Sequence, residues 1–447
     1  MFFNALPGAI SLGLIWGLMA IGVFITYKVL DFADLTVDGS ICTGGAVCAV
    51  LMAAGVNAWA AIIVALIAGA LAGLVTGIFH TLLDIPAILS GILTQLILWS
   101  VNLKIMGQAN TVVDTRGSYV IVTQLEAGWT ILIMFGFLAV IIGALYWFFG
   151  TEIGCGIRAT GNNPNMSRAQ GINVSLNKII GLMISNALVA LAGALLAQYQ
   201  GFADINMGRG AIVIGLAAVI IGEAIVTRIS RNFAVQLSGV LLGGIIYYIV
   251  YQFVIWLELD TEYLKMFSAI VVAIFLAIPY WKKKYFHKFA RFSRKNKKPP
   301  QGGVKEPQTE QGGEGGSVNE KVALRDFNLS VNEGDFITVI GGNGAGKSTL
   351  MNVICGTYPV DEGSIVLGGK DVTRLPEYRR AKYLGRVFQD PMMGTSPNME
   401  IQENLALAYR RGKLRSLMPG IRRSEKQFYR EQLSRLGLGL EARMTAK

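Results

Sequence analysis

Long apolar stretches fill the first two thirds of the chain and then stop. Residues 8–281 are nearly all apolar, whereas residues 282–447 mix polar and apolar positions as a soluble protein does. A helix needs about 20 apolar residues to cross a bilayer. The pattern predicts about nine membrane spans by that length rule. They lie near 9–30, 41–56, 59–80, 85–106, 129–149, 179–200, 210–227, 233–256 and 263–281.

Two of these stretches are weaker than the others. The stretch 41–56 is short and rich in glycine, and 210–227 is glycine-rich at its start. Glycine lowers helix propensity. We therefore expect 41–56 to belong to a broken or re-entrant helix.

Composition agrees with a large membrane domain. Charged residues make up 15% of the 447 residues, against about 25% in ordinary soluble domains. The deficit lies in the first half of the chain. The first half is therefore predicted to be an α-helical transmembrane bundle.

The charges predict how the bundle is oriented. The net charge is +11, and many of the cations follow the last apolar stretch, between Lys282 and Lys298. A basic run beside a span marks the cytoplasmic side and can contact anionic lipid headgroups of the bilayer. Counting back places loop 257–262 outside, loop 150–178 inside and the N-terminus outside. Beside a membrane span, this basic run is not expected to bind nucleic acid. The C-terminal domain is thus expected to be cytoplasmic, on a multi-pass protein of the plasma membrane.

The inner loop 150–178 contains a signal for a short helix. Asn163 is a good N-cap, and Pro164 suits the first helical position. Gly171 is expected to end the helix after about two turns. Composition alone leaves two readings equally open, which are a surface helix that docks into a soluble partner and an ordinary polar loop.

A tether and a phosphate-binding motif follow the apolar region. Residues 292–320 are rich in Lys, Pro, Gly, Gln and Glu, which cannot form a core. This composition predicts a flexible linker over 292–320.

Residues 341–349 match the pattern G-x-x-x-x-G-K-[ST] in full, after an apolar strand expected over 336–340. In such a loop backbone N–H groups surround phosphate, the lysine reaches the outer phosphates, and the Ser hydroxyl binds Mg²⁺. We expect Leu350, Met351, Val353 and Ile354 of the following helix to face a core. The residues predicted to bind ATP are Gly341, Asn343, Gly344, Ala345, Gly346, Lys347, Ser348 and Thr349.

The membrane half resembles a known family. Residues 157–164 (IRATGNNP) and 169–174 (AQGINV) resemble the coupling loop of the branched-chain amino acid and ribose class of ABC importer permeases. Residues 30–40, 85–93 and 105–110 are similar to the subgroup described as putative tryptophan/tyrosine transport permeases. The resemblance implies that residues 163–171 pass ATPase motion to the membrane helices. The coupling residues it implies are Asn163, Pro164, Ser167, Arg168 and Gly171.

The soluble half resembles ABC ATPases. Residues 359–367 with the turn at 368–369 resemble the early sheet of that family, and residues 384–389 resemble the strand that leads to the Q-loop. The resemblance implies that Gln389 is a catalytic residue that senses Mg²⁺ and the attacking water. The chain shows no LSGGQ signature, no second acidic strand motif and no switch histidine after the phosphate loop. We therefore expect that this chain alone does not hydrolyse ATP at a useful rate.

Together these features predict an α-helical transmembrane bundle followed by a partial α/β P-loop nucleotide-binding domain. The expected domains are a transmembrane permease domain over 1–291, a flexible linker over 292–320 and an incomplete ATP-binding domain over 321–447. The predicted function is the permease component of an ATP-driven importer for a small solute, by resemblance an amino acid or a related compound. Its expected partners are a second permease copy, a complete ABC ATPase subunit and an extracellular solute-binding protein. Two alternatives are an exporter half-transporter with a fused ATPase and a non-transporting membrane protein with a remnant nucleotide-binding domain.

Overall fold

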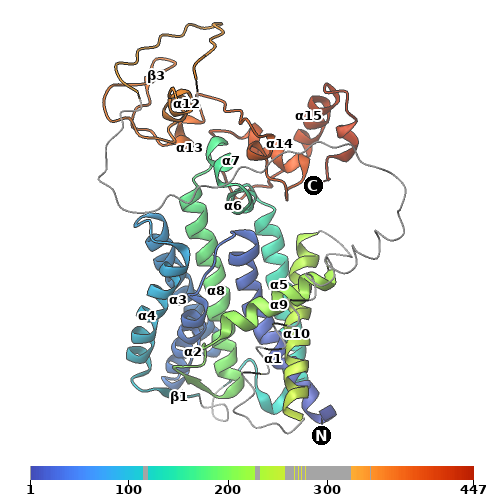
Figure 1. Cartoon of the computed structure of the whole chain (residues 1–447). Coiled ribbons are helices and arrows are strands. Elements are labelled where there is room, and N and C mark those ends of the chain that lie inside the picture. Colours follow the sequence, from blue (N-terminus) through green and yellow to red (C-terminus); the bar gives the residue numbers. More distant parts are fainter. Residues whose placement is uncertain are drawn as a thin grey trace.

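The computed structural model describes residues 2–113, 119–226, 232–256, 324–342 and 344–446, with four isolated positions between 266 and 277. An elongated helical bundle carries a smaller C-terminal part at one end (Figure 1). The predicted linker, the basic run and Asn343 lie outside the described residues. The predicted span 263–281 lies almost wholly outside them.

The bundle consists of long apolar helices and two shorter ones. The helices that run along it are α1 (Phe2–Phe24, continued by the π-helical turn η1, Ile25–Val29), α2 (Val37–Ala53), α3 (Ala58–Thr81), α4 (Ala87–Met106), α5 (Ala127–Phe149, preceded by η2, Gln124–Glu126), α8 (Val174–Gln200), α9 (Ala211–Val226) and α10 (Phe233–Trp256). Strands β1 (Asn110–Val112) and β2 (Phe202–Asp204) pair antiparallel, with Thr111 opposite Ala203.

The described residues contain fewer full-length spans than the predicted nine. Six helices in this part are long and apolar enough to cross a membrane, and α2 and α9 are shorter apolar helices. The counts differ because the predicted nine include these two short helices and the stretch 263–281, which lies almost wholly outside the described residues. The two stretches expected to be weak are these two helices.

The first and second spans are separated by a buried break. After η1 the chain runs without regular structure over residues 30–36, and α2 starts inside the bundle. The Asp34 carboxylate accepts hydrogen bonds from Thr36 N at 2.9 Å and from Asn186 Nδ2 at 2.8 Å. Ser40 Oγ donates to Asn186 Oδ1 at 2.6 Å. These bonds satisfy the polar groups that the break leaves in an apolar surrounding.

Helix α8 forms the centre of the bundle and packs against α1, α2 and α3. The approach of α2 to α8 depends on glycine. A Cβ atom at Gly44 would collide with the backbone of Ala190, and one at Gly193 would collide with the backbone of Ile41. Small residues of this kind let membrane helices come close enough for extensive van der Waals contact.

The two ends of the bundle differ as the charges predict. The N-terminus and the β1–β2 strand pair lie at one end, and helices α6 (Glu152–Asn162) and α7 (Pro164–Ala169) lie at the other, beneath the C-terminal part (Figure 1). The structure thus places loop 150–178 and the nucleotide-binding motif on the same side. The loop holds two helices rather than the single one expected, because Thr151 caps an additional helix, α6, by accepting from Gly154 N.

The C-terminal part is built mainly of short helices and loops. Its elements are α12 (Lys347–Cys355), β3 (Val366–Leu367), β4 (Lys370–Asp371), α13 (Glu377–Arg380), η4 (Pro391–Gly394), α14 (Ile401–Tyr409), α15 (Arg423–Ser434) and η5 (Leu440–Arg443). Strands β3 and β4 form a hairpin, in agreement with the turn expected at 368–369. No other strand pairing occurs in this part among the described residues.

Three expectations for this part were wrong. Residues 336–340 and 384–389 are not strands, and 359–363 does not join the hairpin. A strand forms only where a neighbour pairs with its backbone, and the described residues place none beside 336–340. Phe336 and Ile340 are accordingly 95% and 89% exposed. Met351 is also exposed, while Leu350 of the same helix is buried.

Candidate functional site

The phosphate-binding motif forms a loop at the start of α12. Gly344 and Gly346 have φ values of +85° and +81°, which favour glycine, and Gly346 is the N-cap residue of the helix. Lys347 Nζ donates to the carbonyl oxygens of Gly341 and Gly342, the latter at 2.7 Å. The loop therefore folds around its own lysine ammonium. The first N–H groups of α12 point out of the helix N-terminus, where an anion is stabilised.

The side chains of Ser348 and Gln389 are both accessible. Within the described residues the Gln389 side chain forms no hydrogen bond. The segment that carries Gln389 is attached to α12 through Arg386, which donates to Asn352 Oδ1 at 2.7 Å and to Thr357 Oγ1 at 2.9 Å. This arginine thus connects the segment of Gln389 to the helix that begins with Lys347 and Ser348.

Helix α7 begins and ends as the sequence predicts. Asn163 caps it by accepting from Met166 N at 3.0 Å, and Pro164 is its first residue. The amide of Asn163 also reaches the C-terminal part, where Nδ2 lies 2.9 Å from Thr395 O and 3.0 Å from Met393 O. One side chain therefore caps the helix and holds it against the residues at and after η4.

Gly171 ends this segment at a very close contact. Its φ is +77°, and a Cβ atom there would lie 2.7 Å from Gly412 N and 3.3 Å from Tyr378 O. A side chain larger than hydrogen would push the loop away from α13. Ser167 is fully buried in the contact, whereas Arg168 is exposed and donates to Asn165 Oδ1. The structure thus brings Asn163, Ser167 and Gly171 to the C-terminal part and leaves Arg168 in solvent.

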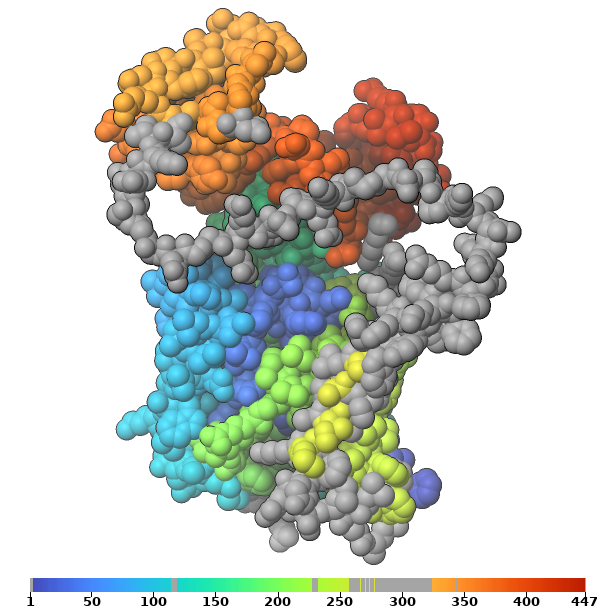
Figure 2. All heavy atoms as spheres, viewed as in Figure 1, coloured from blue at the N-terminus to red at the C-terminus, as the bar shows by residue number. Residues whose placement is uncertain are grey.

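An apolar cluster joins the two parts of the chain. Its buried members from the membrane domain are Cys155, Ala159, Met166 and Ile172, and those from the C-terminal part are Met399 and Leu407. Burial raises the pKa of the Cys155 thiol to about 11, so it is neutral at neutral pH. In the space-filling view the orange and red C-terminal atoms rest on the green atoms of this region (Figure 2).

An ion pair on α6 borders that cluster. Arg158 donates to both carboxylate oxygens of Glu403, at 2.7 and 3.1 Å. Glu403 also accepts from Glu400 N at 2.9 Å and so caps the start of α14. Such bidentate pairs are strong and directional. The pair fixes the orientation of α14 relative to α6.

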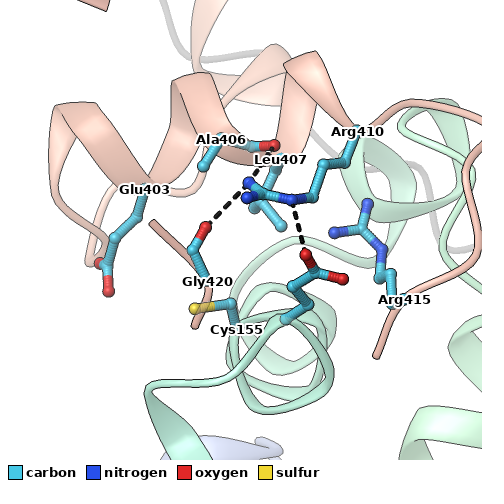
Figure 3. A pocket seen from close by; sticks show the side chains of 8 residues that line it. Cys155, Glu403, Ala406, Leu407, Arg410, Arg415 and Gly420 are labelled. Atoms are coloured by element: carbon cyan, nitrogen blue, oxygen red, sulfur yellow. Dashed lines mark hydrogen bonds and ion pairs between the residues drawn. The ribbon is translucent and has the colours of Figure 1, made fainter. Parts of the chain in front are cut away.

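A second ionic contact is more deeply buried. The side chains of Glu152 and Arg410 are only 4% and 7% exposed, and Arg410 Nε donates to Glu152 Oε1 at 3.0 Å. Arg410 also donates to Gly420 O at 2.8 Å and to the Glu425 carboxylate at 2.7 Å. Figure 3 shows Arg410 reaching from the end of α14 toward Gly420, beside Arg415 and above Cys155.

The other oxygen of Glu152 is also satisfied. It accepts from Ser416 N at 2.9 Å and from Ser416 Oγ at 3.0 Å. Burial alone would raise the pKa of Glu152, but these bonds and the charge of Arg410 outweigh it and hold the pKa below its usual value. Glu152 is therefore ionised at neutral pH. By contrast, burial lowers the pKa of Arg415 in the same small pocket to about 10.

Backbone hydrogen bonds complete this contact. Residues 416–420, here called the strap, run antiparallel to residues 150–153, which follow α5. Glu152 N donates to Met418 O at 2.9 Å, Ile153 N to Ser416 O at 3.3 Å and Gly420 N to Gly150 O at 2.8 Å. The strap is therefore held to the membrane domain by backbone pairing as well as by the side-chain contacts of Glu152.

The ion pairs Glu152–Arg410 and Arg158–Glu403 were not predicted from the sequence. Glu152 and Arg410 are far apart along the chain, and nothing in linear order pairs them. The sequence gives one signal for these contacts, which is that the acid Glu152 and the base Arg158 both lie in the predicted inner loop 150–178. Asn186, a buried polar residue of α8, forms hydrogen bonds to other segments of the bundle.

Comparisons with known proteins agree with this arrangement. Residues 6–278 match the family described as branched-chain amino acid transport system / permease component, and residues 324–445 match the family described as ABC transporter. The fold and these matches define a multi-pass membrane permease joined to an ABC-type ATP-binding region. The chain belongs to the branched-chain amino acid transport system permease family.

Two relatives are similar along the membrane domain. The tyrosine transport system permease protein of Clostridioides difficile (strain R20291) is 39% identical over 265 residues, which cover 59% of this chain and 88% of the relative. An uncharacterized protein of Rickettsia prowazekii (strain Madrid E) is 33% identical over 278 residues, which cover 61% of this chain and 97% of the relative.

The C-terminal part has its own relatives. The tyrosine transport ATP-binding protein of Clostridioides difficile (strain R20291) is 43% identical over 99 residues, which cover 22% of this chain and 39% of the relative. The match spans less than half of that ATP-binding protein. No solved structure matches this chain.

Proposed function

We propose that this chain is the permease of an ABC importer that moves an amino acid into the cytoplasm. The observation that carries the proposal is the 39% identity to a tyrosine transport permease along 88% of its length. An aromatic amino acid such as tyrosine is therefore the first solute to test. The docking of α7 onto the ATP-binding part supports energy coupling through residues 163–171.

In the proposed coupling mechanism, the coupling segment receives motion from the C-terminal part and the helices beside it carry that motion into the membrane domain. Asn163, Pro164, Ser167, Arg168 and Gly171 form or border the coupling segment. The neighbouring helices α5 and α8 enter the membrane directly from this region. A shift of the C-terminal part would therefore be passed to two long helices, because packed helices move as rigid elements.

The proposed nucleotide is ATP, in line with the ABC transporter match. Gly341, Asn343, Gly344, Ala345 and Gly346 would surround its phosphates, with Lys347, Ser348 and Thr349 at the start of α12. The positive φ angles of Gly344 and Gly346 support this fit. When bound, Mg²⁺ would supply charge neutralisation at the phosphates. We propose Ser348 and Gln389 as its protein contacts.

The proposed assembly contains a second permease copy, a complete ABC ATPase subunit and an extracellular solute-binding protein. We propose domain boundaries at residues 291 and 320, which lie close to the ends of the two family matches. The membrane domain supplies the path, and the C-terminal part supplies a nucleotide-binding loop on the cytoplasmic side.

Uptake measurements test the proposed function. Cells that lack their own aromatic amino acid uptake would express the chain with its candidate solute-binding and ATPase partners. Labelled tyrosine, tryptophan and leucine would be supplied outside, and internal label would be measured over time. We expect energy-dependent accumulation of an aromatic amino acid, which replacement of Gly171 by Val abolishes. Accumulation of none of them, or export of preloaded label, would contradict the proposal.

A further inference from the structure

Two of the contacts between the C-terminal part and the membrane domain differ in construction. At α7 the contact is made by the Asn163 side chain and by the close approach of Gly171. At the strap it is made by backbone pairing with residues 150–153 and by the buried Glu152 carboxylate. The first place leads into α8, and the second continues directly from α5. The two contacts therefore act on different membrane helices.

The strap fits its position with little tolerance. Gly420 has an ordinary backbone conformation, yet a Cβ atom there would lie 2.6 Å from Cys155 Sγ and 3.1 Å from Gly150 O. A contact of 2.6 Å requires one side to move, because real Cβ atoms do not approach so closely. A side chain at residue 420 therefore requires the buried Cys155 side chain to move and presses on the backbone oxygen of Gly150.

Charge also makes the contact at Glu152 selective for its partner surface. Glu152 is compensated by Arg410, by the Ser416 donors and by Arg422, whose Nη2 donates to Glu152 Oε1 at 3.3 Å. A partner surface without these groups would leave Glu152 buried and ionised without compensation. Removing one member of a buried ion pair is strongly destabilising, because the other member stays charged in a poorly solvated place. Mismatched surfaces are rejected by such uncompensated groups, which is how many interfaces obtain specificity.

We propose that the strap is a second docking contact, separate from α7, that anchors the ATP-binding part to the end of α5 and selects an ATP-binding part carrying both Arg410 and Gly420. This inference rests on the proposed function only in assigning ATP binding to the C-terminal part. Its partner is the surface formed by residues 150–155 of this chain. An ABC ATPase with a larger residue at the position of Gly420 is excluded from that surface.

A clipping experiment on the full chain tests this. A protease site is inserted in the linker at residues 312–316, the chain is purified in lipid nanodiscs and cut, and the fraction of C-terminal part that stays with the membrane part is measured by size exclusion. We expect the wild-type part to stay bound and Gly420→Ala to release most of it. Gly342→Ala is the matched control, because a Cβ atom at Gly342 meets nothing within 4 Å.

A compensating variant distinguishes loss of the strap contact from misfolding of the Gly420→Ala chain. Cys155→Ala removes the sulfur that a Cβ at residue 420 would strike, so it should restore retention to the Gly420→Ala chain. Glu152→Gln should lower retention about tenfold or more through loss of the charged contact. Wild-type retention in Gly420→Ala, or failure of Cys155→Ala to rescue it, would overturn the proposal. The readout needs neither solute nor ATP, so a negative result leaves the import proposal standing, and failed uptake leaves this one standing.

Discussion

At the scale of single residues, two cations organise the C-terminal part. Arg380 is 1% exposed and donates to four carbonyl oxygens, including Val353 O at 2.7 Å and Ile354 O at 2.9 Å. It thereby caps the end of α12, whose start carries the phosphate-binding loop. Lys347 occupies the opposite end of the same short helix. The loop and its support therefore depend on one element of nine residues.

Replacement of Arg380 by Leu should destabilise the C-terminal part by about 3 kcal/mol, since several buried carbonyl groups lose their donor. Thermal unfolding followed by limited proteolysis would measure this. Arg379→Leu is the matched control because Arg379 is exposed on the same turn. Equal unfolding temperatures for the two variants would show that Arg380 does not support α12.

Replacement of Lys347 by Ala should reduce retention of a labelled ATP analogue about tenfold or more, because a charge-assisted hydrogen bond to phosphate is lost. Filter binding on the purified full chain would measure it. Lys370→Ala, a change at another lysine of the same part, serves as the control. Unchanged retention in Lys347→Ala would mean that residues 341–349 do not surround phosphate in this protein.

At the scale of elements, α7 depends on one residue for two separate tasks. Asn163 Oδ1 caps the helix, while Nδ2 lies within hydrogen-bonding distance of carbonyl oxygens at and after η4. Aspartate is an equally good N-cap but has no N–H donor. The substitution Asn163→Asp therefore separates helix formation from docking.

We predict that Asn163→Asp leaves α7 folded and weakens docking about tenfold, because a carboxylate then faces carbonyl oxygens. Hydrogen exchange at Met166 N would report the helix, and retention after linker cleavage would report docking. Asn165→Asp, a change at an exposed residue of α7, is the control. Docking as strong as wild type in Asn163→Asp would show that the amide contacts are dispensable.

At the scale of the whole molecule, the bundle has two distinct ends. Helices α6 and α7 lie beside the nucleotide-binding part, and the N-terminus lies at the opposite end (Figure 1). Ser11 of α1 donates to the carbonyl oxygen of Ala127, the residue that follows η2, which places η2 toward the N-terminal end. The acidic loop and basic run that predicted this orientation lie outside the described residues. The orientation is therefore open to an independent chemical test.

A cysteine placed at Asn165 should react with a membrane-impermeant maleimide only after cells are permeabilised, whereas one placed at Glu126 should react in intact cells. Both positions are exposed in the structure. They differ only in the end of the bundle to which they belong. The four native cysteines are all buried, which keeps the background low. Labelling of Asn165→Cys from outside would reverse the topology.

The sequence by itself determined the features that depend on local order. Apolar length predicted the long helices, charge asymmetry predicted the orientation, and Asn163, Pro164 and Gly171 predicted α7, because caps and spans are set by neighbouring residues. The phosphate-binding motif was equally readable, although its role stays a prediction. The strands at 336–340 and 384–389 were wrongly predicted, because a strand needs a partner that linear order does not supply.

Only the tertiary structure decided which distant residues meet. The pairs Arg158–Glu403 and Glu152–Arg410 join positions more than 240 residues apart, as their separations of 245 and 258 show. The close contact between Gly420 and Cys155 likewise depends on how α5 and α6 pack against the C-terminal part. Such contacts are set by packing between elements, since charge and size become selective only where burial removes water from both partners.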